Sequence, residues 1–428
     1  MIKIFKSDEF NARYAARDDS SEAARARITG AVAEIIADVR KRGDAALREY
    51  TERFDGCVLD RFELPYAELE KAACEVDADF VEVMRRAAKN IEDFHRRQIR
   101  RGYEITGEKG VILGQRILPL ARVGIYIPGG TAPYPSTVLM NVIPAKLAGV
   151  GEIIIATPPS KDGGVDTAIL AAAKIAGADR VFTIGGAQAI AALAYGTESI
   201  PKVDKITGPG NAYVAEAKRQ VFGAVGIDML AGPSDILIIA GENADAALIA
   251  ADMLSQCEHG ADSPAVLVTV SETLAERVCA EIEQQIKELT REAIAREAIN
   301  NHGRIIVAKS LEQAFDITND LAPEHLEIFL DDPYSYLSKV TNAGSVFLGK
   351  HTPEALSDYF AGPNHTLPTS GTARFSSPLS VDDFVKKSSY TYYTGEALNA
   401  VAADVVCFAE KEGLDAHAKS VLKRMQDV

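Results

Sequence analysis

Cysteine is scarce in this sequence and shows no pattern of pairing. Only five cysteines occur among 428 residues, an odd number that shares no short spacing: Cys57, Cys74, Cys257, Cys279 and Cys407. This scarcity argues against a disulfide framework and against a Cys-x-x-Cys metal site. We therefore expect the protein to work in a reducing cytoplasm.

Long hydrophobic runs are missing as well. No apolar stretch approaches the ~20 residues that span a bilayer, so we expect no membrane partner. The segment Met1–Lys6 has no apolar core followed by a small-residue cleavage site, so we expect no signal peptide. The formal net charge of −15 also disfavours the basic face that nucleic acid would require, and no nucleic-acid partner is expected.

The length and the periodicity of the chain predict more than one α/β domain. A chain of 428 residues exceeds one ordinary hydrophobic core. Helical spacing predicts helices over 22–43, 65–75 and 77–100. From about 105, short β-branched runs alternate with Ala-rich helical runs in two successive series. This alternation is typical of parallel sheets covered by helices. After a turn-rich polar stretch at 366–380, we expect a helical tail.

Three glycine clusters lie in the first of these series, at 129–130, 185–186 and 208–210. The second and third stand where a strand hands over to a helix, where backbone N–H groups can bind an anion such as a pyrophosphate. None matches G-x-G-x-x-G, so the usual dinucleotide fingerprint is absent. Tight turns that need no ligand are the more common explanation of each such cluster.

A group of polar residues suggests a metal site. Gln256 and His259 stand three residues apart at the end of an expected helix, so they would project from one face. Asp358 and His417 stand in other short polar motifs. Mixed nitrogen and oxygen ligands without a thiolate suit Zn²⁺ in an open catalytic site. Each residue alone could be an ordinary solvated polar group, and only their grouping favours a metal.

Glu324 and His325 are adjacent, follow a proline and could divide acid–base work. The alternative is a helix-start glutamate beside a partly exposed histidine.

Cys257 could form a thiohemiacetal in aldehyde oxidation, but it should point away from the face of Gln256 and His259, and we favour a packing role. The other histidines lie among charged or loop residues and receive no function here: His95, His302 and His351.

Taken together, the motifs resemble those of the histidinol dehydrogenase family, whose zinc- and NAD-dependent members complete histidine biosynthesis. The motifs appear in the family's order over nearly the whole chain: G-I-Y-I-P-G-G (124–130), G-G-A-Q-A-I (185–190), T-G-P-G-N-A-Y-V (207–214), D-M-L-A-G-P-S-D (228–235), Q-C-E-H-G (256–260), A-P-E-H-L-E (322–327), D-Y-x-x-G-P-N-H-x-L-P-T (358–369) and E-G-L-D-A-H (412–417).

The resemblance implies a role for each matching residue. Zinc, one per subunit, would be bound by Gln256, His259, Asp358 and His417. His325 would be the general base, and Glu324 would activate water. The substrate would also contact these residues and Ser234, His365 and Glu412. NAD would contact Tyr126, Gln188 and Asn211. Position 257, often a small apolar residue in the family, is cysteine here.

The expected architecture is two incomplete Rossmann-like parallel-sheet domains, a short N-terminal segment and a C-terminal arm exchanged in a homodimer with shared active sites. By that analogy Glu412 and His417 would serve the neighbouring subunit. The expected boundaries are 1–22 for the segment, 23–104 plus 233–378 for the metal and substrate domain, 105–232 for the NAD domain and 379–428 for the arm.

The expected reaction is oxidation of L-histidinol to L-histidine through L-histidinal, with two NAD. The runner-up is a related zinc and NAD dehydrogenase that acts on another amino alcohol or on a sulfonated diol. A zinc hydrolase using Glu324 to activate water is a further alternative, although it has no use for the glycine clusters. A non-catalytic metal or nucleotide binder is disfavoured because the Glu324–His325 pair and the ligand set are intact.

Overall fold

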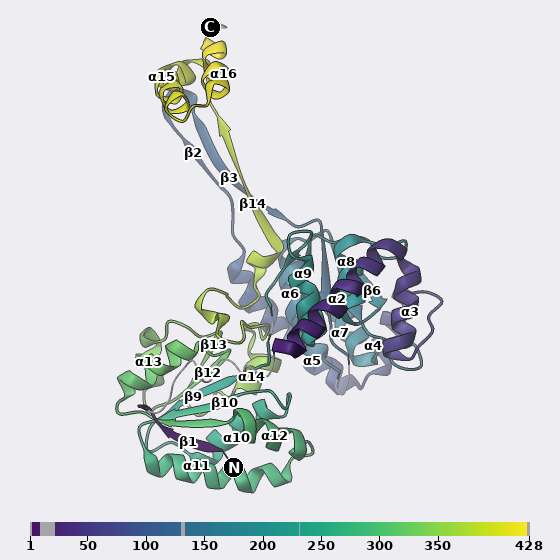
Figure 1. Ribbon diagram of the computed structural model, residues 1–428, viewed down its shortest axis with the longest axis vertical. Coiled ribbons are helices and arrows are strands. Elements are labelled where there is room, and N and C mark those ends of the chain that lie inside the picture. Colours follow the sequence, from purple (N-terminus) through teal and green to yellow (C-terminus); the bar gives the residue numbers. More distant parts are fainter. Residues whose placement is uncertain (1, 9–21, 130–132, 231, 426–428) are drawn as a thin grey trace. The chain divides into compact units, whose positions relative to one another are not determined.

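The computed structural model describes residues 2–8, 22–129, 133–230 and 232–425 (Figure 1). The chain divides into two compact units: Met1–Gln98 with Ala121–Phe384, and Ile99–Leu120 with Val385–Val428. Much of the expected N-terminal segment 1–22, Gly130 of the first glycine cluster and Ala231 lie outside the described residues. No helix in the described part of the chain is long and apolar enough to cross a membrane.

The first parallel sheet of the larger unit, here called sheet A, has six strands. Their order is β1 (Lys3–Lys6), β11 (Arg304–Val307), β10 (Ala265–Thr269), β9 (Ile236–Ala240), β12 (His325–Phe329) and β13 (Ser345–Leu348). Ile236 and Ile238 share a core with α10 (Ala246–Cys257), α11 (Glu272–Gln285) and α12 (Glu292–His302). Leu237 and Ile239 pack instead with α13 (Leu311–Leu321). Helices therefore cover both faces of the sheet, which explains its continuous apolar strands.

The second parallel sheet, sheet B, has five strands. Their order is β6 (Arg180–Thr183), β5 (Glu152–Thr157), β4 (Arg122–Tyr126), β7 (Lys205–Thr207) and β8 (Gly226–Ile227). It packs with α8 (Gly186–Tyr195) and α9 (Ala212–Val221), and α6 (Pro135–Ala148) contacts β4, β5 and α7 (Thr167–Ala176). The predicted α/β class with two parallel sheets is confirmed.

The N-terminal helices belong to a different sheet from the one that we expected. Side chains of α2 (Glu22–Arg42) and α3 (Asp44–Asp55) share one core with Ile154, Phe182 and Ile206 of sheet B. Helix α4 (Tyr66–Glu75) packs on α7, and α5 (Ala78–His95) packs on α6. We had expected residues 23–104 to form one domain with residues 233–378. Helical periodicity identifies the apolar face of a helix but not the surface that this face covers.

The N-terminal strand β1 also differs from the separate segment that we expected, because it pairs with β11 at the edge of sheet A.

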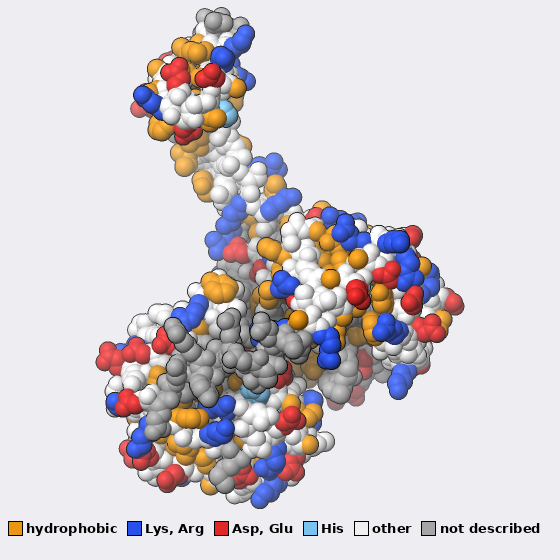
Figure 2. All heavy atoms as spheres, viewed as in Figure 1, with side chains coloured by type: hydrophobic (Ala, Val, Ile, Leu, Met, Phe, Trp, Pro, Cys, Tyr) orange, Lys and Arg blue, Asp and Glu red, His pale blue; other side chains and the backbone are white. Residues whose placement is uncertain are grey.

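The surface of the larger unit carries charges of both signs. On the face drawn in Figure 2, acidic and basic side chains of the described residues are interspersed over this unit. Such mixing is typical of an ordinary solvated surface.

The smaller unit is an arm of three antiparallel strands and two helices (Figure 1). The strand order is β14 (Val385–Tyr392), β3 (Ile112–Pro119) and β2 (Tyr103–Thr106), and α15 (Gly395–Lys411) packs on α16 (Asp415–Met425). The helical tail was predicted, but the strands were not. Seven of the eight residues of β14 are exposed, so the strand lacks the alternation that marks a half-buried strand.

Candidate functional site

The carboxyl ends of sheet B form one cavity. Strand order reverses between β4 and β7, and ligands of open parallel sheets bind outside the carboxyl ends at such a point. Tyr126 ends β4, Thr157 ends β5 and Gly186 follows β6, and all three line a cavity of about 1110 Å³. Gln188 and Asn211 line it too, so the three residues expected to contact NAD lie together.

These three residues differ in how free they are to bind a ligand. The Gly186 N–H donates to the Tyr126 hydroxyl over 3.0 Å, and burial raises the pKa of Tyr126 to about 12. The Oδ1 of Asn211 caps α9 by accepting from the N–H groups of Tyr213 and Val214. Gln188 is 1% exposed, and its Oε1 has no partner among the described residues. A buried amide without a partner is costly, so Gln188 is the side chain here that most needs a ligand.

The amino ends of sheet A contribute to a second cavity, of about 1390 Å³. Ser234 lies just before β9, Glu324 lies just before β12, and His325 is its first residue. Gln256 lines this cavity too, because α10 begins after β9 and returns its last turn to the amino edge. Asn211 lines both cavities and thus marks where they meet.

Asp235, which the sequence analysis missed as a candidate, holds the Glu324–His325 pair in place. The Glu324 N–H donates to Asp235 Oδ1 over 2.9 Å, and the Asp235 N–H donates to Glu324 Oε2 over 3.0 Å. Burial raises the pKa of Asp235 to about 6. Burial and then the Asp235 charge raise the pKa of Glu324 well above its usual range. A cation in the cavity would oppose this shift and favour the carboxylate.

His325 has the protonation pattern of a general base. Its Nδ1 lies 2.9 Å from the carbonyl oxygen of Asp235, which can only accept, so Nδ1 carries the proton. Its Nε2 therefore has a lone pair and has no hydrogen-bond partner among the described residues, although Asp358 Oδ1 lies 3.9 Å from it. Burial lowers the pKa of His325 to about 4, helped by His259 and His365. The ring is consequently neutral near pH 7.

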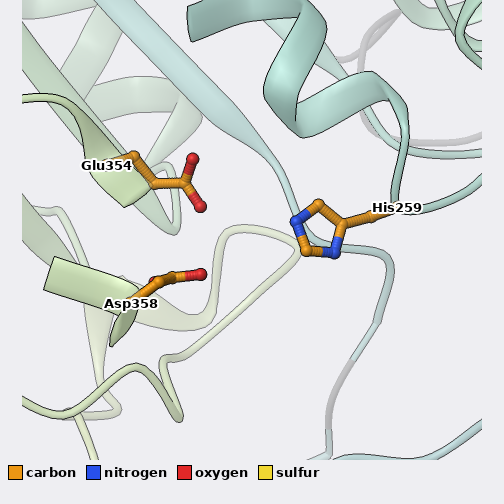
Figure 3. Close-up of side chains that lie close together, drawn as sticks. All are labelled: His259, Glu354 and Asp358. Carbon is orange, nitrogen blue, oxygen red and sulfur yellow. The ribbon is translucent and has the colours of Figure 1, made fainter. Parts of the chain in front are cut away.

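Three side chains form a possible metal-binding group. Potential ligand atoms of His259, Glu354 and Asp358 all lie within 4.8 Å of one another, and Figure 3 shows the two carboxylates and the imidazole ring turned toward a common space. Gln256, fully buried, lines the same cavity, and neither its Oε1 nor its Nε2 has a partner in the described part of the chain. An orphaned amide beside imidazole and carboxylate ligands fits a zinc ion.

The local structure around these ligands differs in two ways from our expectation. His259 lies just past the end of α10, and its N–H donates to the carbonyl of Gln256, so the two residues share a turn rather than a helix face. Asp358, which we had placed only in a short polar motif, lies in a π-helical turn, Ser357–Ala361. Single π-helical turns are frequent at functional sites.

Glu354, which the sequence analysis also missed, is a member of this group and connects it to a buried carboxyl cluster with Glu327. Glu327 Oε1 accepts from the Glu354 N–H over 2.9 Å, and Glu354 Oε2 accepts from the Ser255 hydroxyl over 3.2 Å. Burial and then the charge of Asp252 raise the pKa of Glu327 to about 9. Burial and then Asp358 raise that of Glu354 to about 8. A lone glutamate at each position gives no sequence signal; only the fold brings them together.

His365 reaches the cavity, but both of its ring nitrogens already have partners. Its Nδ1 donates to the carbonyl oxygen of Asp358 over 2.9 Å, and its Nε2 lies 3.3 Å from the Thr137 hydroxyl. Burial lowers its pKa to about 4. This neutral ring fixes the backbone at Asp358, and a substrate would have to replace Thr137 to reach its Nε2.

A proline inside α6 anchors the segment that carries His365. Pro144 has no N–H, so the carbonyl of Met140, four residues earlier, lacks its helical partner. The side-chain amide of Asn364 donates to this carbonyl over 2.6 Å. His95, which received no function from the sequence, is fully buried and its Nε2 lies 3.4 Å from the same amide. His95 is therefore a buried structural residue of the site, whereas we had expected it to lie among charged or loop residues.

Cys257 is buried in the core of sheet A, and burial raises the pKa of its thiol to about 12. The thiol is therefore protonated at neutral pH and is a poor nucleophile. The predicted packing role is confirmed.

Glu412 and His417 belong to the arm, not to the unit that carries these cavities. Glu412 follows the last residue of α15, His417 lies in the first turn of α16, and both side chains are exposed. Three of the four expected zinc ligands thus line one cavity of the larger unit, and the fourth lies in the other unit.

Comparisons with known proteins identify the family of this chain. A model of the histidinol dehydrogenase family matches residues 18–425. Histidinol dehydrogenase of Bacillus cereus is 54% identical over 396 residues, covering 92% of each chain, and that of Listeria innocua is 51% identical over 411 residues, covering 96% of each. A crystal structure of histidinol dehydrogenase from Elizabethkingia anophelis has a TM-score of 0.89 at 37% identity, covering 100% of this chain and 98% of that one. This chain therefore belongs to the histidinol dehydrogenase family.

Proposed function

We propose that this protein oxidises L-histidinol to L-histidine through L-histidinal, the last steps of histidine biosynthesis, with two NAD and one zinc ion per subunit. The observation that carries the proposal is the free Nε2 of His325, which lines the same cavity as Gln256, His259 and Asp358. The curated relatives named histidinol dehydrogenase support the choice of substrate.

Gln256, His259 and Asp358, with His417, would hold the zinc. When bound, zinc would orient the substrate by taking its amine and imidazole nitrogens as ligands. NAD, bound beside Tyr126, Gln188 and Asn211, would accept one hydride in each of the two steps.

The chain's own residues would move the protons. His325 takes the alcohol proton on Nε2 while its Nδ1–H stays on the Asp235 carbonyl, which keeps the ring in the required tautomer. Glu324 then orients the water that adds to the aldehyde carbon, and Asp235 fixes its position through the two reciprocal hydrogen bonds. Loss of the second hydride and a proton from the hydrate gives the acid.

The arm would complete the site of a neighbouring subunit in a homodimer, with Glu412 contacting the substrate and His417 binding zinc. A mixture of His325→Asn and His417→Ala protomers tests this. An exchanged arm gives heterodimers with one intact site, so activity reappears on mixing. The matched control mixes His325→Asn with His259→Ala, two changes in the larger unit, and should stay inactive. Failure of the first mixture to regain activity would contradict the exchange.

The test of the reaction is the yield of NADH per molecule of L-histidinol, with zinc-loaded and chelator-stripped protein side by side. We expect two NADH per substrate, lost on stripping and restored by zinc. No NADH from the zinc-loaded protein would favour the alternative dehydrogenase of another amino alcohol or sulfonated diol. Failure to bind NAD at all would favour the zinc hydrolase. A cytoplasmic location remains part of the proposal and rests on the scarce cysteines.

A further inference from the structure

A buried ion pair lies at the wall of the second cavity, which Asp228 lines, and has none of the roles described above. Lys218 of α9 and Asp228, which follows β8, form a salt bridge in which the two side chains are 2% and 1% exposed. Taking two charges out of water is costly, and an apolar pair is often at least as stable. A buried pair therefore calls for an account of what its hydrogen bonds hold.

The hydrogen bonds of this pair all end on backbone at the cavity wall. Lys218 Nζ donates to the carbonyl oxygen of Gly208 over 3.0 Å. The Gly208 N–H donates to Asp228 Oδ2 over 2.8 Å, and the Met229 N–H donates to Asp228 Oδ1 over 2.7 Å. Both backbone groups of Gly208 are thus held by the pair. Asp228 also fixes the start of the segment that leads toward Ser234.

Gly208 needs this support because its backbone is unusual. Its φ of +107° lies outside the conformations that other residues adopt, and a Cβ there would overlap the carbonyl oxygen of Tyr126. Three residues later, Asn211 begins α9 and lines both cavities. The conformation at Gly208 therefore sets where Asn211 stands relative to Tyr126.

We propose that Lys218 and Asp228 are a positioning pair that holds the proposed NAD-binding segment around Gly208–Asn211 in register with Met229 at the wall of the proposed substrate cavity. Neither side chain needs to touch a ligand. The pair acts through Gly208 and Met229, so its loss should weaken NAD binding without removing zinc. The inference rests on the proposed function for the identity of the ligand.

The test is the double variant Lys218→Met/Asp228→Asn, which removes both charges together. We expect its Kd for NAD, measured by calorimetry on the zinc-loaded protein, and its KM for NAD to rise at least about tenfold, roughly what the loss of one or two aligned hydrogen bonds costs. Zinc content should be unchanged. The control is Lys205→Met/Asp383→Asn, an ion pair between β7 of sheet B and the turn Val381–Phe384, and neither of its residues lines a cavity.

The possible outcomes distinguish a failure of the positioning role from a failure of the proposed function. A folded double variant that binds NAD as tightly as the wild type overturns the positioning role alone. A wild type that neither binds NAD nor oxidises histidinol overturns both proposals. If the double variant does not fold, the single variant Asp228→Glu is tested instead. This variant keeps both charges of the ion pair, but its longer side chain displaces the Gly208 N–H. Its NAD affinity should fall several-fold while Asp383→Glu changes nothing, and an unchanged affinity in Asp228→Glu would overturn the inference.

Discussion

The two parallel sheets of the larger unit present opposite edges to the site. Sheet B uses the carboxyl ends of its strands, where a helix N-terminus and glycines provide backbone groups and the buried Gln188 Oε1 has no hydrogen-bond partner among the described residues. Sheet A uses the amino ends of β9 and β12, where Asp235, Glu324 and His325 bring buried titratable groups together. The first edge is suited to holding a ligand, and the second is suited to moving protons.

The two edges also differ in the kind of side chain whose pKa is perturbed. At sheet A, burial shifts the pKa values of His325, Glu324, Asp235 and Asp358 toward their neutral forms. Such clusters mark sites of chemistry more often than sites of binding alone. Changes at the two edges should therefore separate into effects on turnover and effects on NAD affinity.

The largest effect should come from His325→Asn. Removing the base should lower kcat by about 10²–10⁴-fold, because that is the usual contribution of a positioned general base. Zinc content should stay at the wild-type level, since His325 is not among the expected ligands. Steady-state NADH production and metal analysis measure the two quantities, with His302→Asn at the end of α12 as control. Full activity in the variant would remove His325 from its role.

Gln256→Ala should mainly weaken zinc binding. We expect an affinity lower by at least about 10–100-fold, the range found when a group that supports a metal site is lost. Competition with a chromogenic chelator measures it. The control is Gln285→Ala on α11, whose amide donates to the Ala247 carbonyl away from the cavity. Equal zinc affinity in the two variants would contradict the assignment of Gln256 as a ligand.

The buried carboxyl cluster predicts a dependence of stability on pH. The folded-state pKa of Glu327 is raised to about 9, so the folded protein holds a proton that the unfolded chain has lost above about pH 4.3. Its contribution to stability is present at low pH and lost as the pH rises toward 9, with a slope of up to about 1.4 kcal/mol per pH unit.

Chemical unfolding of zinc-free protein between pH 6 and 9 measures that slope. Glu327→Gln carries no titratable group at this position, so its free energy of unfolding should fall less steeply with pH than that of the wild type. Parallel curves would mean that Glu327 does not hold the proton.

At the other edge, Gln188→Leu should raise the KM for NAD by about 3–10-fold, because one hydrogen bond contributes roughly 0.5–1.5 kcal/mol. The affinity for zinc should not change. An equal rise in the KM for L-histidinol would show that the two edges are not separable in this way.

The smallest effect on turnover should come from Cys257→Ala. The thiol is protonated and buried, so kcat should stay within about twofold, while the lost packing should cost about 1 kcal/mol of unfolding free energy. Kinetics and thermal unfolding check the two values. A large loss of kcat with unchanged stability would reopen the thiohemiacetal mechanism.

The sequence predicted the local elements of the site better than the contacts between distant segments. Strand–glycine–helix junctions are local, so the alternation of elements around sheet B followed from the sequence. Asp235 and Glu354 could not be found in this way, because their roles depend on segments about 90 and 27 residues away meeting them across sheet A. We assigned helices α2 and α3 to the wrong sheet for the same reason, because the apolar face of a helix does not indicate which sheet it packs against.

Pro144 has a consequence for attempts to stabilise this protein. Replacing a helix-interior proline by alanine is an obvious thermostabilising substitution, since proline costs about 3 kcal/mol relative to alanine there. In this helix the new N–H would compete with Asn364 for the Met140 carbonyl. The gain in the helix would then loosen the segment that carries His365, so selection for heat resistance and selection for turnover should favour different residues at this one position.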